Sequence, residues 1–153
     1  MRAGSDATGF SLPEAILALG LLAGVLISLS GLFVQADALM RGGKHQTEAL
    51  AVARNILEDA DSWHFRALYE RFGFDGNAAS YTVDSRSNAA AAGWQADLDR
   101  DLRRAHAEIR LESIGGSGTP PPLSETRAIR ITVKVLWHEA RRDRSVCVAT
   151  VRM

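Results

Sequence analysis

The chain has 153 residues, enough for about one domain of ordinary size. Its 46% apolar and 24% charged residues fit a folded protein and exclude a disordered or collagen-like chain. The 18 basic residues balance 18 acidic ones, so the bulk charge does not support a nucleic-acid-binding role. The single cysteine, Cys147, excludes an internal disulfide and a cysteine-based metal site.

An uninterrupted apolar segment lies near the N-terminus. The run from Ala15 to Val34 contains no ionisable residue. About 20 apolar residues, rising about 1.5 Å each in a helix, span about 30 Å, the thickness of the hydrocarbon core of a bilayer. No later segment of the sequence resembles a second span. The pattern predicts one transmembrane helix.

Three interpretations of this run are open. A cleaved secretory signal peptide is one, because Ala36-Asp37-Ala38 matches an A-x-A cleavage pattern. However, the run is longer than the apolar region of about 7–15 residues in a signal peptide. An uncleaved signal anchor is the second interpretation, for which length alone suffices. The third interpretation depends on the six residues in front of the span.

Residues 9–14 read Gly-Phe-Ser-Leu-Pro-Glu, after a short polar leader and directly before the apolar run. This segment resembles the processing motif of the type IV prepilin family: a glycine, then Phe or Met, and a glutamate four positions after it. The resemblance implies that prepilin peptidase removes residues 1–9 by cutting between Gly9 and Phe10. It also implies that Phe10 becomes an N-methylated amino terminus. Glu14 matches the glutamate of the family, the charge partner of the Phe10 amine on a neighbouring subunit.

The chemistry of the first turn agrees with this resemblance. An ionised side chain such as Glu14 is costly at the edge of an apolar span and normally implies a partner. A buried charge pair specifies register more reliably than it adds stability. Pro13 is compatible with a helix that begins at Phe10, because a proline in the first turn removes no helical hydrogen bond.

Two glycines inside the span form a G-x-x-x-G pair, Gly20 and Gly24. Small residues let transmembrane helices approach one another closely. A helix that only anchors a domain has no need of such a face. The pair therefore predicts a helix-packing surface.

Residues 35–63 continue with helical spacing, interrupted at Gly42-Gly43, where we expect a bend or flexible joint. The amphipathic half should pack against a sheet. Its predicted apolar stripe comprises Leu39, Leu50, Ala53, Ile56, Leu57 and Ala60.

The remaining segments predict a small antiparallel sheet and one more helix. We expect strands at residues 80–83, 108–112, 129–137 and 146–151, a helix over 94–105, and a charged turn from 139 to 144. The fold class is therefore α+β, with a long N-terminal helix on a small antiparallel sheet, as in pilins. Residues 48–58, 94–98 and 131–137 are also similar to segments of two related groups. These groups are the minor pilins of type IV pilus modification (V-type) and the minor pseudopilins of type II secretion.

Catalytic and metal-binding motifs are absent from the sequence. The four histidines, at positions 45, 64, 106 and 138, have no metal-ligand spacing. No nucleophile elbow or phosphate-binding glycine loop occurs either. We therefore expect no enzymatic activity, no cofactor and no metal.

A basic cluster lies in the predicted turn, formed by Arg141, Arg142 and Arg144. Arginines at an exposed tip can contact phosphates, and some minor pilins act as DNA receptors. Glu139 and Asp143 are interleaved, however, so a solvated charged hairpin is the default and DNA is not expected as a partner.

These observations predict a minor pilin or pseudopilin in a type IV pilus-like filament or its initiating tip complex. The leader would be residues 1–9, the transmembrane helix 10–34 and the periplasmic domain 35–153. The resemblance implies a single-pass inner-membrane protein that then joins a filament. Its partners would be other pilin or pseudopilin subunits, prepilin peptidase, the inner-membrane assembly platform and membrane lipid. The alternatives are a DNA-uptake minor pilin and a signal-anchored periplasmic binding module.

Overall fold

A computed structural model describes residues 11–115, 118–139 and 142–153. Gly9, Phe10 and Arg141 lie outside the described residues. The chain separates into two compact units, the first ending at Arg41 and the second running from Gly42 to Met153. The elements, in chain order, are α1 (Leu12–Ser62), α2 (Ala67–Glu70), β1 (Ser80–Asp84), the 3₁₀ turn η1 (Ala89–Ala91), α3 (Ala92–Asp101), β2 (His106–Ser113), β3 (Ile129–Glu139) and β4 (Arg142–Arg152).

Helix α1 runs through the glycine pair at Gly42-Gly43, so the predicted interruption there is wrong. A glycine inside a helix costs about 0.5–1 kcal/mol relative to alanine. Helix-favouring neighbours offset this cost. Two ion pairs, each between residues one helical turn apart, flank these glycines. Arg41 Nη2 lies 2.5 Å from Asp37 Oδ2, and Lys44 Nζ lies 3.5 Å from Glu48 Oε1.

From Ala15 to Val34, α1 contains no ionisable residue on any side. Its large apolar side chains from Leu12 to Val34 are 45–77% exposed. Ser11 precedes the helix, and its carbonyl accepts a hydrogen bond from the amide of Ala15 at 3.1 Å. Pro13 therefore lies in the first turn, as the sequence predicts, where the missing N–H breaks no helical hydrogen bond.

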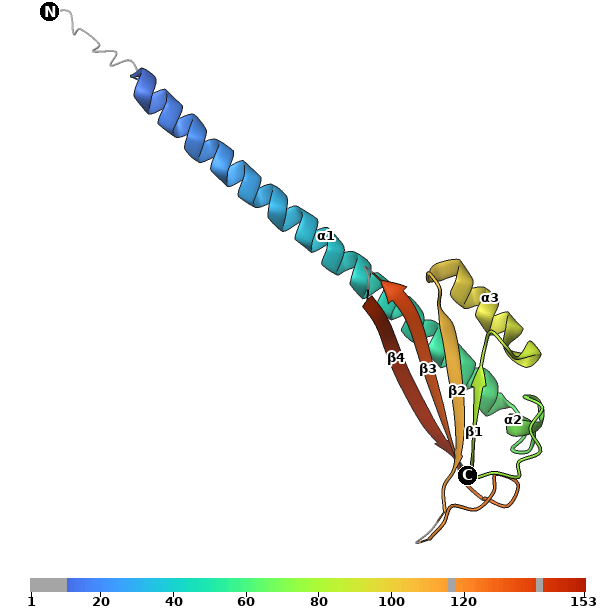
Figure 1. Cartoon of the computed structure of the whole chain (residues 1–153). Helices are drawn as coiled ribbons and strands as arrows, with labels where there is room; N and C mark the ends of the chain where they lie inside the picture. The colour runs from blue at the N-terminus through green and yellow to red at the C-terminus, as the bar shows by residue number, and fades with distance from the viewer. Residues whose placement is uncertain (1–10, 116–117, 140–141) are drawn as a thin grey trace, which may run out of the picture. The chain divides into compact units, whose positions relative to one another are not determined.

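The second unit is built on a four-stranded antiparallel sheet in the order β1-β2-β3-β4 (Figure 1). Antiparallel hairpin partners pair in sequence order, which explains this simple meander. The register between β3 and β4 runs one residue against one, from Ile129 opposite Arg152 to Glu139 opposite Arg142. The pairing therefore contains no bulge, and side chains alternate between the two faces of the sheet along its whole length.

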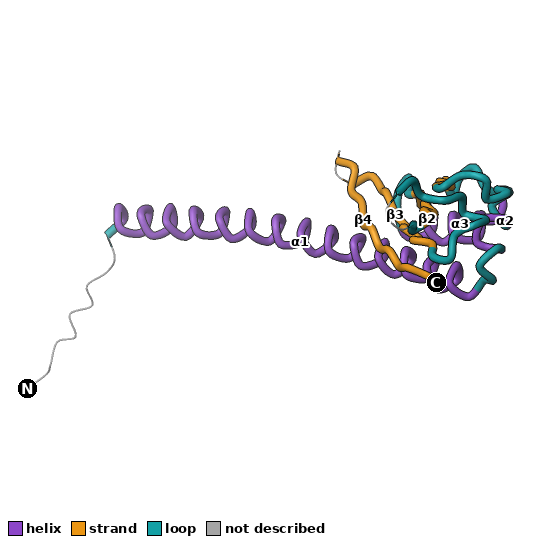
Figure 2. Tube along the Cα trace, turned by 90° about the horizontal axis from the view of Figure 1, so that it is seen from below, coloured by secondary structure: helices purple, strands orange, loops and turns teal. Residues whose placement is uncertain are grey.

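The core lies between one face of this sheet and the part of α1 after Gly42, as Figure 2 shows from below. Small residues on α1 let the helix approach the sheet closely. The buried set from α1 is Ala49, Val52, Ala53, Ile56 and Ala60. The sheet contributes Val83, Ala107, Ile109, Leu111, Ile129, Ile131, Val133, Val135 and Trp137.

The predicted stripe on this helix was only partly right. Leu39 is 72% exposed and belongs to the first unit, and Leu50 and Leu57 are only half-buried. Ala49 and Val52 are buried, although the stripe omitted them. Ala53, Ile56 and Ala60 of the stripe are buried as predicted, and the small side chains of the alanines allow close contact with the sheet.

Helix α3 is shorter than its pattern indicates. It ends at Asp101, not at residue 105, because Leu102 is already extended (φ −127°, ψ 138°). Arg104 then takes a left-handed conformation with φ 52°, which turns the chain into β2. Leu102 and Ala105 are nevertheless buried, so the helical spacing of these apolar residues continued past the end of the helix.

Strand β4 is longer than predicted, since it begins at Arg142 and pairs with Glu139. The turn expected from 139 to 144 is therefore shorter, and Asp143 and Arg144 belong to the strand. Their charges are compatible with a strand because β4 is at the edge of the sheet, where side chains reach solvent.

Candidate functional site: a membrane-length helix and one end of the sheet

Of the residues proposed for processing and assembly, Glu14 and the glycine pair lie on the exposed part of α1. Glu14 is exposed in the first turn, where a negative charge complements the positive end of the helix dipole. A Cβ atom added at Gly20 or Gly24 would meet nothing within 4 Å in the chain. The glycine pair is thus free to approach another molecule. Gly9 and Phe10 are outside the described residues.

Among the described residues, α1 is the one helix long and apolar enough to cross a membrane. The apolar window of α1 lies near the N-terminus and has no buried residue. A membrane span and a signal anchor both have these properties.

One end of the sheet carries a cluster that connects β3, β4 and α1. Glu139 follows Trp137 in the alternation of β3 and therefore faces α1. Its side chain is only 18% exposed. One carboxylate oxygen of Glu139 lies 3.0 Å from His45 Nδ1, and the other lies 3.7 Å from Arg144 Nε. A Cβ atom at Gly42 would stand 3.6 Å from this carboxylate, so the glycine leaves room for it.

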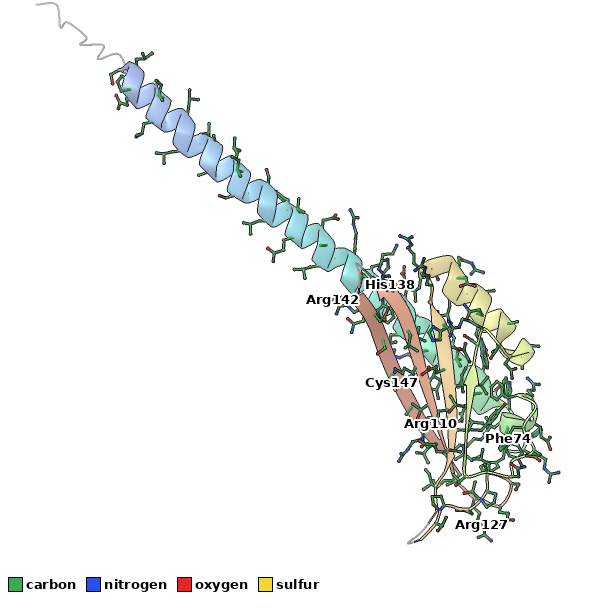
Figure 3. The ribbon with its side chains drawn as sticks, viewed as in Figure 1. Phe74, Arg110, Arg127, His138, Arg142 and Cys147 are labelled. Atoms are coloured by element: carbon green, nitrogen blue, oxygen red, sulfur yellow. The ribbon has the colours of Figure 1, made fainter. Side chains whose placement is uncertain are left out.

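The arginines proposed for DNA contact have different surroundings. Arg144 is beside Glu139, whose carboxylate offsets its charge. Arg142 is exposed and has no ion pair among the described residues, and Figure 3 labels it at the start of β4. Between them, Asp143 Oδ1 lies 2.9 Å from His138 Nδ1. The strand thus alternates basic and acidic groups, and Arg141 is outside the described residues.

The opposite end of the sheet holds the C-terminal end of α1. The guanidinium of Arg152, in β4, donates to the carbonyl oxygens of Trp63 and, at 3.5 Å, of Ala60. The Ala60 carbonyl also accepts from the amide of Trp63 at 3.3 Å, and a cation such as Arg152 complements the negative end of the helix dipole. No local pattern predicts this contact, because the two elements are 92 residues apart.

A second contact missed from sequence fixes α3 against α1. The indole N–H of Trp94 donates to Asp59 Oδ2 at 2.8 Å. Trp63 stacks on Trp94 with a centroid separation of 5.7 Å, and Arg71 lies 4.5 Å above the Trp63 ring. Asp59 is exposed on α1, and its carboxylate satisfies the donor of a largely buried tryptophan.

One carboxyl in the described chain has a clearly shifted pKa. The hydrogen bond from the Arg86 side chain lowers the pKa of Asp84 to about 2, against a smaller opposing effect of burial. Arg86 Nη2 lies 2.6 Å from Asp84 Oδ2. This ion pair joins the last residue of β1 to the turn that follows the strand.

A hollow of about 270 Å³ lies at the β2–β3 end near the positive-φ residue Arg104. It is lined by Arg104, His106, Leu136, Trp137, His138 and Asp143. His106 Nδ1 and Trp137 Nε1 are buried without a hydrogen-bond partner among the described residues. Among the residues that the structure describes, no group of three or more His, Cys, Asp or Glu side chains is arranged to hold a metal ion.

No protein-family model matches the sequence, and comparisons with curated proteins and with solved structures find no match either. The class of the molecule therefore follows from its architecture. A long apolar N-terminal helix packs through its later part on a four-stranded antiparallel sheet, and this is a pilin-like architecture.

Proposed function

We propose that this protein is a structural subunit, a minor pilin or pseudopilin, of a type IV pilus-like filament or its initiating tip complex. The observation that carries the proposal is the contrast along α1. Its large apolar side chains up to Val34 are at least 45% exposed, whereas Ala49 to Ala60 bury one face in a complete domain core. The exposed part needs an apolar environment, which lipid supplies first and neighbouring subunits supply in a filament.

The first turn supplies the chemistry of assembly. Cleavage after Gly9 would create a cationic amine at Phe10, four residues before Glu14. When helices from successive subunits pack together, Glu14 would neutralise the amine of a neighbour. The protein would act as a substrate of prepilin peptidase, in the inner membrane and with its second unit in the periplasm. The assembly platform would then transfer it into the filament.

Replacing Glu14 tests the proposal. Without the carboxylate, the Phe10 amine has no counter-charge in the packed helices, and an unpaired buried charge costs about 3–5 kcal/mol. We expect Glu14→Ala to lower recovery in sheared filaments about a hundredfold or more, with leader removal preserved. Ser28→Ala is the matched control, because Ser28 Oγ only donates to its own helix, at Gly24 O. Normal recovery of the Glu14→Ala protein in filaments would instead support a simple anchor.

Processing is tested separately by the mass of the protein extracted from membranes. We expect an N-methylated Phe10 terminus, and a retained leader when Gly9 is replaced by a bulky residue. A signal-anchored binding module would keep Met1 to Gly9 in a host that has prepilin peptidase, and that mass would contradict the proposal.

A further inference from the structure

Strand β3 extends past the start of β2 at one end of the sheet. His106, the first residue of β2, pairs with Leu136, so the last three residues of β3 pair only with β4. Just before β2, the carbonyl of Arg103 accepts from the amide of His138 at 3.3 Å. In an unbroken antiparallel ladder, the residue opposite His138 would be Arg104. The chain entering β2 therefore carries one residue more than β3 at this point, as in a β-bulge.

Arg104 lies inside this extra length, and its backbone conformation is costly. Its φ of 52° is the one positive value among the described residues other than glycine. The left-handed region disfavours residues with a Cβ atom, and a glycine there would remove the strain. Bulges re-aim side chains, and strained residues of this kind cluster at functional sites. An arginine at such a position therefore indicates a role for its side chain.

Arg104 lines the hollow of about 270 Å³ beside β2 and β3, at the end of β3 where Figure 3 labels His138. It is exposed and makes no ion pair among the described residues. Asp143 is the one carboxylate among the described lining residues, and its Oδ1 already lies 2.9 Å from His138 Nδ1. The guanidinium of Arg104 is therefore a cation that a ligand can use.

Two further nitrogen atoms of the lining residues lack a partner. His106 Nδ1 and Trp137 Nε1 are buried and make no hydrogen bond among the described residues. Trp137 is only 5% exposed, and its indole N–H can only donate, so it needs an acceptor. A buried polar group without a partner is costly. Water would satisfy these atoms, but it does not account for an unpaired arginine in a strained backbone.

The lining limits the chemistry of a ligand. An arginine and an unsatisfied N–H both require an oxygen acceptor, and the cation favours an anion. Leu136 and Trp137 add apolar surface, and Asp143 disfavours a doubly charged group such as phosphate. The hollow is smaller than the range of about 300–1,000 Å³ that is usual for small-molecule pockets. It therefore fits one carboxylate on a short apolar stem.

We infer that this hollow is a carboxylate-binding site, in which Arg104 pairs with the carboxylate and Leu136 and Trp137 contact the stem. The ligand is a small carboxylic acid or a glutamate side chain of another protein, since the two share this chemistry. The inference uses residues of the second unit alone and does not depend on the proposed role in a filament.

Binding is tested on the purified full-length chain in detergent, at constant ionic strength. Butyrate is the free-acid probe, with butyramide as its uncharged control. A capped tripeptide with a central glutamate is the protein-type probe, with the glutamine peptide as its control. The readout is the nuclear magnetic resonance signal of the Trp137 indole N–H, assigned by its loss in Trp137→Phe. We expect a saturable shift with a Kd of about 1–10 mM for at least one carboxylate and no shift with either control.

Variants of the bulge identify the cation. We expect Arg104→Gln to weaken binding about tenfold or more, because hydrogen bonds from a charged donor are lost. Arg103→Gln is the matched control, since Arg103 is an exposed neighbour outside the lining of the hollow. Arg104→Gly should also lose binding, while its midpoint of thermal unfolding rises by about 4 °C because the strain is removed. An arginine with a purely structural role would not show these two opposite effects.

The two probes distinguish the sources of the carboxylate. A shift with butyrate would show that a small acid is sufficient, and a shift with the peptide alone would assign the site to a protein partner. No saturation with either probe, or equal binding by the wild-type and Arg104→Gln proteins, would overturn the inference. A lower unfolding midpoint in Arg104→Gly would also overturn it, because Arg104 would then serve the fold and not a ligand.

Discussion

Arg152 shows how one residue can hold an element that is distant in sequence. Its guanidinium donates to two carbonyls at the end of α1, where no basic residue lies in the last turn of the helix itself. Because hydrogen bonds to a charged donor and the helix dipole both contribute, we expect Arg152→Met to lower the free energy of unfolding by about 1–2 kcal/mol. Chemical denaturation measures this loss. Arg130→Met is the control, since Arg130 is exposed on β3 without an ion pair among the described residues, and an equal loss there would contradict the capping role.

The ion pair of Asp84 and Arg86 predicts a dependence of stability on pH. The folded-state pKa of Asp84, about 2, is below its ordinary value of 3.8. The pair therefore stabilises the fold above about pH 4, and this contribution is lost as the pH falls through about 2. We expect Arg86→Ala to return the Asp84 pKa toward 3.8 and to remove this part of the acid sensitivity.

Nuclear magnetic resonance titration of the Asp84 carboxyl measures the shift directly. Arg110→Ala serves as the control, because Arg110 lies 2.8 Å from Glu112 within strand β2 and makes no ion pair with Asp84 among the described residues. An unchanged Asp84 titration in the Arg86→Ala protein would show that Arg86 does not lower the pKa.

At the scale of elements, strand β3 was predictable and the ends of its neighbours were not. Its inward residues Ile131, Val133 and Val135 are all apolar, and this alternation is sufficient to specify a strand. The end of α3 was misjudged because Leu102 and Ala105 stay buried in a non-helical backbone. Periodicity reports burial, and the chain can continue to bury residues after the helical hydrogen bonds have ended.

The charged cluster at Glu139 could have been partly anticipated. The alternation of β3 that makes Trp137 face the core also makes Glu139 face α1, and a carboxylate in such a position needs a partner. Its partner His45 could not be identified, because 94 residues separate the two and nothing local links them. The same holds for Arg152, whose acceptors are backbone carbonyls that carry no sequence pattern.

The exposed helix face predicts an effect confined to assembly. Replacing Gly24 by isoleucine meets no atom within 4 Å in the chain, so we expect thermal unfolding of the second unit to be unchanged. A β-branched side chain would hold a neighbouring helix away, and we expect a reduced yield in filaments. Leu22→Ile, on the opposite side of the helix, conserves volume and serves as the control. Normal assembly of the Gly24→Ile protein would remove the glycine pair from the packing surface.

For the whole molecule, the position of the core predicts where the chain can be divided. Every buried apolar residue of the described chain lies between Ala49 and Trp137, and the first unit contributes none. We expect residues 35–153, produced alone, to be soluble, monomeric and cooperatively folded. Circular dichroism, thermal unfolding and light scattering measure these properties. An insoluble or non-cooperative fragment would mean that the first unit is needed for the second to fold.

The distance in sequence between α1 and its cap has a consequence for the order of events during synthesis. Arg152 emerges from the ribosome 92 residues after Ala60, whose carbonyl it binds, and Glu139 emerges 94 residues after His45. Until β4 has emerged, β3 is paired on one side only and the end of α1 lacks its cap, so contacts this distant must form late. Throughout this interval the apolar run before Gln35 is already complete. Under the proposed function, the membrane would therefore receive the helix before the domain behind it has closed.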